Sequence, residues 1–143
     1  MPTGECAFCR IVGGLVPAEL VLADDEFVAF LDHRPLFHGH CLVVPRAHHE
    51  TLSDLPEPLR GGLFGRVQAL TRAVELATEA EGSFIAINNR VSQSVPHLHV
   101  HVVPRRKGDG LKGFFWPRTR YRDAAEAAET AERIRAALGR TEP

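Results

Sequence analysis

Three histidines alternate with apolar residues in the run His97-Leu98-His99-Val100-His101-Val102-Val103. A period of two is typical of a β-strand, so we predict a half-buried strand over 97–103 with its three imidazoles on one face. Imidazole titrates near neutral pH and can serve as acid, base, nucleophile or metal ligand. The row therefore indicates acid–base and nucleophilic chemistry on phosphorus or a three-histidine zinc site that activates water, unless these are ordinary strand residues.

Two cysteines, Cys6 and Cys9, stand at the spacing at which both thiolates can reach one metal ion. A tetrahedral structural zinc needs four ligands and no second such pair follows in the chain, so histidines would have to complete the set. The candidates are His97 and one of the neighbours His48 and His49. The alternatives are an inert pair of small core residues and a redox pair.

The elements that must position these residues follow from the spacing of apolar residues. Strands are expected over 20–23 and 27–31, joined as a hairpin by a polar turn, and again over 41–44 and 84–87. One long helix is expected over 58–81, with Gly82 ending it, and an alanine-rich helix over 123–138. We therefore predict an α+β fold, in which an antiparallel sheet of about five strands carries one long helix and a smaller C-terminal helix.

Composition indicates an ordinary globular protein. The 143 residues have the size of one domain, with 44% hydrophobic and 24% charged residues. A net charge of −1 gives no overall attraction for nucleic acid, and an odd number of cysteines argues against a disulfide framework. There is neither an apolar run long enough to span a membrane nor the pattern of a secretory signal, so we expect a cytoplasmic protein without membrane or nucleic-acid partners.

The histidine row and its surroundings resemble the signature of the histidine triad (HIT) family, in which histidines alternate with apolar residues in the same way. Two further segments match in the family's order: Gly39–His48, the strand that precedes the long helix, and Gln93-Ser94-Val95, which leads into the triad. The resemblance runs from about Cys6 to about Arg106 and implies a HIT-like fold. Because the family pairs two such domains into a continuous sheet, it also implies a homodimer.

The same resemblance implies a nucleotide hydrolase or nucleotidyl transferase. It would cleave an adenosine or guanosine derivative, either a nucleoside phosphoramidate or a dinucleoside polyphosphate, at the α-phosphorus through a nucleotidyl-histidine intermediate. His99 would be the nucleophile, and His101 and His40 would stabilise or shuttle charge. The implied substrate-binding residues are Asp32 for the ribose hydroxyls, Phe30 for the base, and Asn88, Gln93 and Ser94 for the phosphate. The alternatives are a nucleotide-binding or signalling module with little activity and a three-histidine zinc hydrolase.

A structural zinc is also implied by the resemblance. In some members of the wider family, a Cys-x-x-Cys pair, a histidine after the matching strand and the first triad histidine hold zinc. On this chain the corresponding ligands are Cys6, Cys9, His48 and His97, the pair lying in an N-terminal segment of residues 1–19. We expect this zinc to pin the N-terminus against the triad strand, while the chemical step itself needs no metal.

Residues 105–143 form a separate region, a basic loop followed by the C-terminal helix. The basic run over 105–122 is expected to be either a solvated surface or a segment that reaches over the active site, with Trp116 as a platform for stacking.

Overall fold

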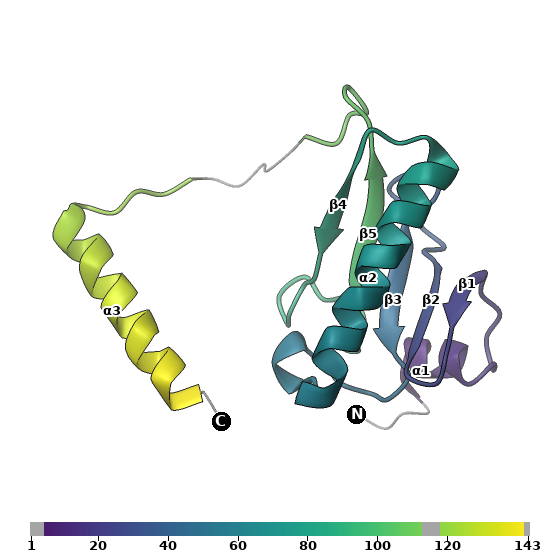
Figure 1. Ribbon diagram of the computed structural model, residues 1–143, viewed down its shortest axis with the longest axis horizontal. Helices are drawn as coiled ribbons and strands as arrows, with labels where there is room; N and C mark the ends of the chain where they lie inside the picture. Colours follow the sequence, from purple (N-terminus) through teal and green to yellow (C-terminus); the bar gives the residue numbers. More distant parts are fainter. Residues whose placement is uncertain (1–4, 113–117, 142–143) are drawn as a thin grey trace. The chain divides into compact units, whose positions relative to one another are not determined.

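The computed structural model describes residues 5–112 and 118–141, and the chain divides into two compact units, Met1–Asp109 and Gly110–Pro143. The first unit holds most of the secondary structure (Figure 1). Its elements are α1 (Ala7–Val12), β1 (Leu20–Ala23), β2 (Phe27–Leu31), β3 (Cys41–Pro45), a 3₁₀ helix (Leu52–Asp54), α2 (Glu57–Thr78), β4 (Gly82–Ala86) and β5 (Val100–Arg105). The second unit contains α3 (Ala124–Thr141).

The five strands form one antiparallel sheet in the order β1-β2-β3-β5-β4. The predicted hairpin is present as β1 and β2, and the strand that carries the triad lies between β3 and β4. This architecture, an antiparallel sheet of five strands with one long helix and a C-terminal helix, confirms the α+β fold predicted from the sequence. In the part of the chain that the structure describes, no helix has both the length and the apolar character needed to cross a bilayer.

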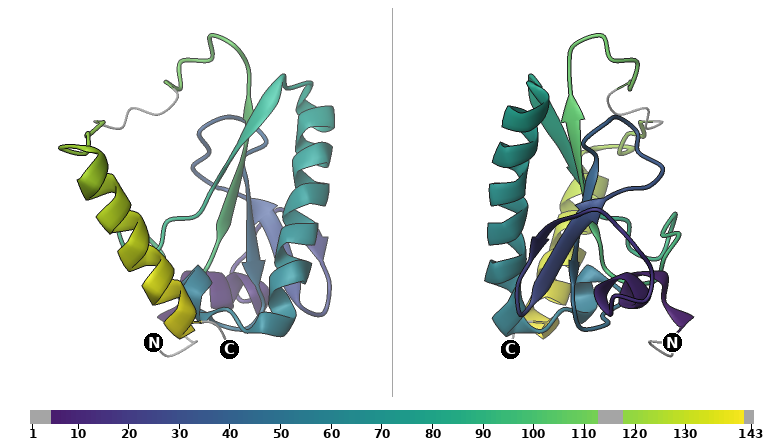
Figure 2. Two further views of the ribbon diagram at one scale, coloured as in Figure 1. Left: turned by 60° about the vertical axis from the view of Figure 1, so that its left-hand side comes forward. Right: turned by 90° about the vertical axis from the view of Figure 1, so that its right-hand side faces the viewer.

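The sheet separates two clusters of buried side chains. On one face the apolar stripe of α2, which includes Leu63 and Val74, packs against alternate residues of the central strands. The predicted core residues Leu98, Val100 and Val102 belong to this face and are fully buried. α1 lies on the other side of the sheet, as the edge-on view in Figure 2 shows, above a second cluster that contains Phe8, Phe30 and Leu42 among other residues. The alternation within β5 therefore turns its histidine towards α1.

Several boundaries differ from those predicted. The strand expected over 97–103 begins only at Val100 and continues to Arg105, because His97 lies in a bend and Pro104 still pairs with Ser83. The long helix ends at Thr78 rather than near Gly82, because Glu79 adopts a left-handed backbone conformation with a φ of 54°. Gly82 instead begins β4, two residues before the predicted strand.

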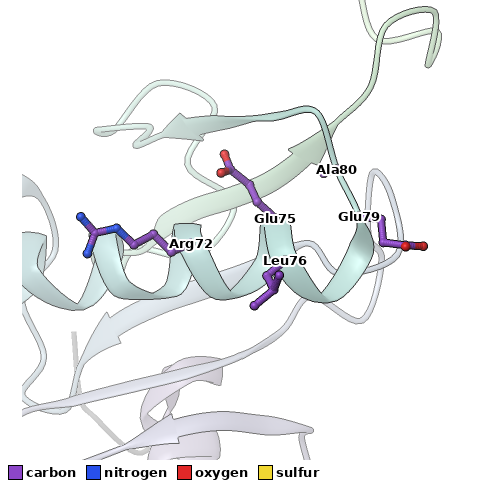
Figure 3. A pocket seen from close by; sticks show the side chains of 5 residues that line it. All are labelled: Arg72, Glu75, Leu76, Glu79 and Ala80. Carbon is purple, nitrogen blue, oxygen red and sulfur yellow. The ribbon is translucent and has the colours of Figure 1, made fainter.

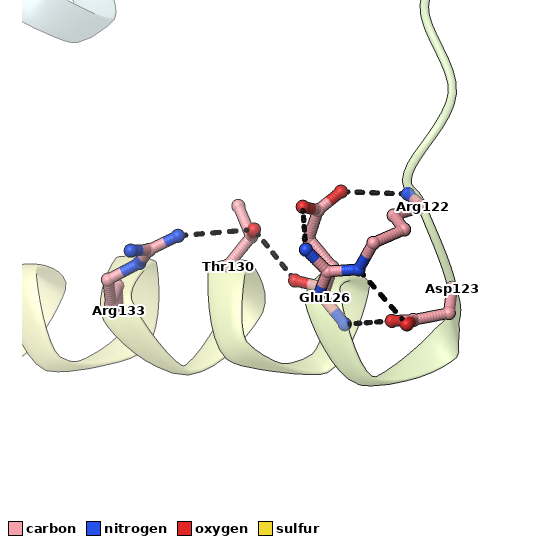
Figure 4. Close-up of polar contacts among 5 residues, drawn as sticks. All are labelled: Arg122, Asp123, Glu126, Thr130 and Arg133. Atoms are coloured by element: carbon pink, nitrogen blue, oxygen red, sulfur yellow. Dashed lines mark hydrogen bonds and ion pairs between the residues drawn. The ribbon is translucent and has the colours of Figure 1, made fainter.

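The described part of the second unit is dominated by α3, which begins and ends later than the predicted helix over 123–138. Asp123 accepts a hydrogen bond from the backbone N–H of Glu126, and Arg122 forms ion pairs with both of these carboxylates (Figure 4). These contacts satisfy free N–H groups in the first turn and place negative charge at the positive end of the helix dipole. Trp116 and its aromatic neighbours lie outside the described residues.

Candidate functional site

The register of the sheet brings side chains from β2, β3 and β5 together on the face beside α1. Phe30 pairs with Leu42, and Leu42 pairs with His101, so these three side chains form a row across β2, β3 and β5. Asp32 directly follows β2 and His40 directly precedes β3. They lie opposite one another beyond the last strand pair, and the Asp32 N–H donates a hydrogen bond of 2.9 Å to the His40 carbonyl. The sheet therefore places a carboxylate and two imidazoles from segments far apart in the sequence beside one another.

These side chains line a cavity of about 480 Å³ between the sheet and α1. Apolar residues form most of its wall, while the polar groups are few. Of the residues predicted from the sequence, the cavity is lined by Phe30, Asp32, Ser94, His99 and His101. A mostly apolar pocket with a few convergent polar groups is the usual form of a small-molecule site.

The ring orientation of His99 follows from its hydrogen bond. Its Nδ1 atom lies 2.7 Å from the carbonyl oxygen of His97. A carbonyl oxygen can only accept, so His99 Nδ1 carries the proton and Nε2 keeps its lone pair. Burial lowers the pKa of His99, which favours this neutral form at physiological pH. The ring is only 3% exposed and packs edge-on against Phe8, with centroids 5.0 Å apart. His99 is thus a fixed, neutral imidazole with one lone pair available.

His40 and His101 form a hydrogen-bonded pair whose proton positions are also determined. The backbone N–H of Leu36 donates to His40 Nδ1 at 3.0 Å, so the proton of neutral His40 must lie on Nε2. His40 Nε2 lies 3.0 Å from His101 Nδ1, which must therefore accept. The proton of neutral His101 is consequently on Nε2. Asp32 Oδ2 lies 3.6 Å from His40 Nε2, the atom that carries the proton between the two rings.

Two opposing influences act on the proton affinity of this pair. Burial lowers the pKa of His40, and burial together with the neighbouring His99 and His40 lowers the pKa of His101 to about 4. The negative charge of Asp32 acts in the opposite direction on both rings. The carboxylate is therefore the group that favours a proton on the pair.

Asp32, His40 and His101 also lie close enough together to be considered as metal ligands, with their ligand atoms within 4.8 Å of one another. The hydrogen bond from Leu36 argues against this role. A neutral imidazole has only one lone pair on its two nitrogens, and that of His40 already accepts the Leu36 N–H at Nδ1. Binding a cation at Nε2 would require His40 to lose that bond or to become an anion. We therefore interpret this group as a hydrogen-bonding network.

A second cluster fits a metal ion well. The ligand atoms of Cys6, Cys9, His48 and His97 all lie within 4.8 Å of one another. His97 Nδ1 is 3.3 Å from Cys6 Sγ and 3.5 Å from Cys9 Sγ, and His48 Nδ1 is 3.4 Å from Cys9 Sγ. In a tetrahedral zinc site, Zn–S and Zn–N bonds of ordinary length separate neighbouring N and S atoms by about 3.6 Å. The spacing of these donors therefore suits zinc closely.

The tautomer of His97 supports the same conclusion. Its Nε2 lies 2.8 Å from the carbonyl oxygen of Pro45 and must donate to it, which leaves the lone pair of Nδ1 facing the two sulfur atoms. Burial lowers the pKa of His97 to about 4, so the ring is neutral, as a ligand must be. Burial and the nearby Cys6 raise the pKa of Cys9 to about 11, so a bound cation would have to displace its proton.

The three triad histidines consequently do not converge on one point. His97 faces the cysteines, His99 is held by a backbone carbonyl, and His101 accepts from His40. Among the described residues, neither group of potential metal ligands contains all three. This geometry disfavours the three-histidine zinc hydrolase that the sequence left open.

Two of the predicted phosphate ligands lie elsewhere. The carboxamide of Gln93 accepts from the Arg90 N–H at 2.8 Å and donates to the Glu50 carbonyl at 2.7 Å, so it braces the loop that leads into the triad. Neither Gln93 nor Asn88 lines the cavity. Asn89, which follows Asn88, accepts from the Leu52 N–H at 2.9 Å. Of the predicted phosphate-binding residues, Ser94 alone is placed at the cavity.

Sequence reasoning missed the contribution of α1 to the cavity. Phe8 and Arg10, which lie within and next to the Cys-x-x-Cys motif, both line it. Cys6 caps α1 by accepting the Cys9 N–H, so the helix begins at the metal-compatible cluster. The signal was present in the sequence, because residues between two ligands of one ion must lie close to that ion. The cluster thus fixes one wall of the cavity.

Comparison with known proteins places this geometry in context. The model of the HIT domain matches residues 14–108. An adenylylsulfatase, HINT3, of Arabidopsis thaliana is 32% identical over 109 residues, which are 75% of this chain and 55% of that protein, so the match spans about half of its length. An adenosine 5'-monophosphoramidase, HNT1, of Candida albicans is 29% identical over 119 residues, 79% of this chain and 78% of that protein.

Solved structures agree with the sequence comparisons. A protein from Streptococcus mutans UA159 superposes with a TM-score of 0.86 at 34% identity, covering 94% of this chain and 85% of that one. A zinc-bound histidine triad family protein from Mycobacterium smegmatis superposes with a TM-score of 0.72 at 37% identity, covering 98% of this chain and 99% of that one.

Proposed function

Because this chain belongs to the HIT domain family, we propose that it is a nucleotide hydrolase acting at an α-phosphorus through a covalent nucleotidyl-histidine intermediate. Two of its relatives are named as an adenylylsulfatase and an adenosine 5'-monophosphoramidase, which both cleave a bond to the phosphorus of adenylate. The proposed substrates are an adenosine or guanosine phosphoramidate or a dinucleoside polyphosphate.

The observation that carries the proposal is the tautomer of His99. The bond from its Nδ1 to the His97 carbonyl leaves the Nε2 lone pair as the nucleophile, on a neutral ring in the cavity. Fixing the ring in one orientation removes the entropic cost of aligning a nucleophile with phosphorus. The carbonyl also stabilises the positive charge that develops on the ring when Nε2 forms a bond.

The reaction then has two steps. His99 Nε2 attacks the α-phosphorus, the bond to the leaving group breaks, and the leaving group departs with a proton from His101 Nε2. Water next attacks the same phosphorus, the N–P bond breaks, and the nucleoside monophosphate is released while one water proton returns to the histidine pair. Each step balances without a redox partner or a metal ion.

The remaining cavity residues suit the parts of a nucleotide. Phe30, together with Phe8 and Ile11, offers an apolar wall for the base, Asp32 offers carboxylate oxygens to the ribose hydroxyls, and the Ser94 hydroxyl can donate to a phosphate oxygen.

Zinc has a structural part in this proposal. Cys6, Cys9, His48 and His97 would hold it, and it would supply a fixed link between α1 and the triad segment rather than a Lewis acid. The donor spacing supports this assignment, as does the zinc-bound relative from Mycobacterium smegmatis.

A homodimer completes the proposal. β4 pairs with β5 and is the last strand in the order of the sheet. Ile85 on β4 is 40% exposed, and Leu76 on α2 is 83% exposed beside a shallow hollow (Figure 3). Exposed apolar residues on the last strand of a sheet and on a helix are consistent with pairing between two copies.

Dimer formation can be tested by light scattering. Ile85→Lys should reduce the measured mass to that of one chain, whereas Val21→Lys on β1, at the opposite edge of the sheet and 49% exposed, should not. Loss of association in the Val21 variant alone would show that the interface lies at β1 rather than at β4.

The activity can be tested by incubating the protein with adenosine 5'-phosphoramidate and, separately, with diadenosine polyphosphate labelled at the α-phosphorus. We expect turnover of at least one substrate and a labelled protein adduct that is stable in alkali and labile in acid. Tight nucleotide binding without turnover of either substrate would favour the nucleotide-binding module instead.

A further inference from the structure

The Asp32 side chain divides its two oxygens between different partners. Oδ1 accepts the backbone N–H of Arg34 at 2.9 Å, which closes the turn that follows β2. Oδ2 lies 3.6 Å from His40 Nε2. The side chain is only 18% exposed, so water screens this second contact incompletely. The carboxylate is thus aimed at the histidine pair before any substrate is present.

The donors and acceptors around the pair form a directed series. The Leu36 N–H donates to His40 Nδ1, and His40 Nε2–H donates to His101 Nδ1. If the pair binds an additional proton between the rings, both facing nitrogens carry a hydrogen, and the pair itself offers no acceptor for one of these two N–H groups. Asp32 Oδ2, which lies 3.6 Å from His40 Nε2, is the acceptor that such an N–H can find. The pair can hold a positive charge here because a negative charge lies beside it.

We propose that Asp32 is a positioning residue of the proposed reaction, whose carboxylate favours the positively charged form of the His40–His101 pair, the form from which the leaving group receives its proton. The inference rests on the proposed function and adds to it a role for Asp32 that does not depend on the ribose. The carboxylate does not touch the reacting atoms.

The proton balance of the first step shows why this charge matters. The step proceeds from the form in which the pair holds one additional proton and is positively charged beside the Asp32 carboxylate. The His101 Nε2 proton passes to the leaving group as its bond to phosphorus breaks and the bond from His99 Nε2 forms. The pair is left neutral, and water restores its proton when it attacks the intermediate. Without the carboxylate, two buried imidazoles would lose this proton to water.

A residue that only recognises the ribose would behave differently. Removing its charge would raise KM for a ribonucleotide and would have no effect on a substrate that lacks both ribose hydroxyls. A positioning residue acts on the chemical step whichever sugar is bound, so its loss lowers kcat for both substrates. The two roles are separated by a substrate without the ribose diol.

The experiment compares Asp32→Asn with the wild type on adenosine 5'-phosphoramidate and on its 2',3'-dideoxy analogue. Asparagine keeps an oxygen for the Arg34 N–H, so the turn is retained. We expect kcat of Asp32→Asn on the dideoxy substrate to fall at least about tenfold, since opposite charges about 4 Å apart in a partly buried site interact strongly. Asp25→Asn, in the exposed hairpin turn, is the matched control and should keep the wild-type kcat.

Two further measurements guard against a simple folding defect. Asp32→Glu keeps the charge and should recover most of kcat on the dideoxy substrate, which a loss of ribose contacts would not explain. The limb of the kcat–pH profile that falls with rising pH should move to lower pH in Asp32→Asn. The other titratable groups facing the pair, His99 directly before β5 and the exposed His33 beside Asp32, are unchanged in this variant.

The outcomes are distinguishable. If the wild type turns over neither substrate, the proposed function fails, whatever Asp32 does. If the wild type is active and Asp32→Asn keeps the wild-type kcat and pH profile on the dideoxy substrate, while KM rises only for the ribonucleotide, the positioning role is overturned and Asp32 is a ribose ligand alone.

Discussion

The Nδ1 atom of His99 lies 2.7 Å from the carbonyl oxygen of His97, two residues earlier in the same motif. The His97 ring has the opposite arrangement, because its Nε2 donates to the Pro45 carbonyl and its Nδ1 lone pair faces Cys6 and Cys9. The carbonyl to which each ring donates its N–H thus determines which nitrogen of His97 and which nitrogen of His99 keeps a lone pair. One lone pair faces two thiols, and the other is available for phosphorus.

Replacing His99 tests this division directly. His99→Ala removes the only lone pair proposed to bond phosphorus, so turnover should fall by at least about a thousandfold. Acid-labile labelling of the protein by an α-labelled nucleotide should disappear with it. Both are measured by quenching the reaction and separating protein from free nucleotide. His38→Ala, an exposed histidine outside the cavity, is the control and should retain activity and labelling. Full activity in the His99 variant would exclude it as nucleophile.

The adjacent pair His48 and His49 gives a matched test of the zinc site. His48 Nδ1 lies 3.4 Å from Cys9 Sγ, whereas His49 is not part of the cluster of potential ligands. His48→Ala should therefore lower the zinc content per chain and the affinity for added zinc by at least about tenfold, while His49→Ala should leave both unchanged. Metal analysis of the purified variants and a competition titration with a chromogenic chelator measure the two quantities. Equal zinc loss in both variants would contradict the assignment.

A structural zinc and a catalytic zinc differ in what their removal does. Cys6→Ser weakens a link between α1 and the triad segment, so the melting temperature should fall by several degrees or more. The rate per folded molecule, measured well below that temperature, should change much less. A chelator should lower the melting temperature of the wild type in the same way without abolishing turnover. Loss of activity in proportion to zinc, with stability unchanged, would show that the metal takes part in the reaction.

The fold was predictable because apolar periodicity determines it. Apolar runs identified β2 and β3, alternation identified β5, and the steps of three and four identified α2. The same alternation misplaced His97, which lies in a bend because its ring is held by Pro45 and faces the cysteines. A period of two predicts which side chains share one face of a strand. It carries no information about contacts with α1, which comes from the N-terminal part of the chain.

The candidate site was predictable only in part, for a similar reason. His40, Asp32 and Phe30 could be placed near the triad from the resemblance alone, whereas the register that makes them neighbours across the sheet is known only from the structure. Gln93 was expected at a phosphate, but its carboxamide is used by the backbone of Arg90 and Glu50. Side chains of loop residues have several possible partners, and only the folded backbone decides among them.

The dependence of stability on pH follows from the buried imidazoles. In the unfolded chain a histidine has a pKa near 6.5, whereas burial and two neighbouring histidines lower the pKa of His101 to about 4 in the folded protein. Between these values the unfolded chain binds more protons, so the free energy of unfolding falls as the pH falls from about 6.5 to about 4. Above pH 6.5 the full stability is present.

His101→Gln should make this acid-induced loss smaller. A shift of this size corresponds to about 3 kcal/mol at most, and the partial access of water to the ring reduces the expected difference to about 1 to 2 kcal/mol between pH 7 and pH 4.5. Urea unfolding of the wild type and the variant at both pH values, with chelator present throughout so that zinc release contributes to neither, measures it. His38→Gln, at an exposed position, should keep the wild-type dependence. If His101→Gln loses as much stability as the wild type over this interval, the ring is not held neutral by burial in the folded protein.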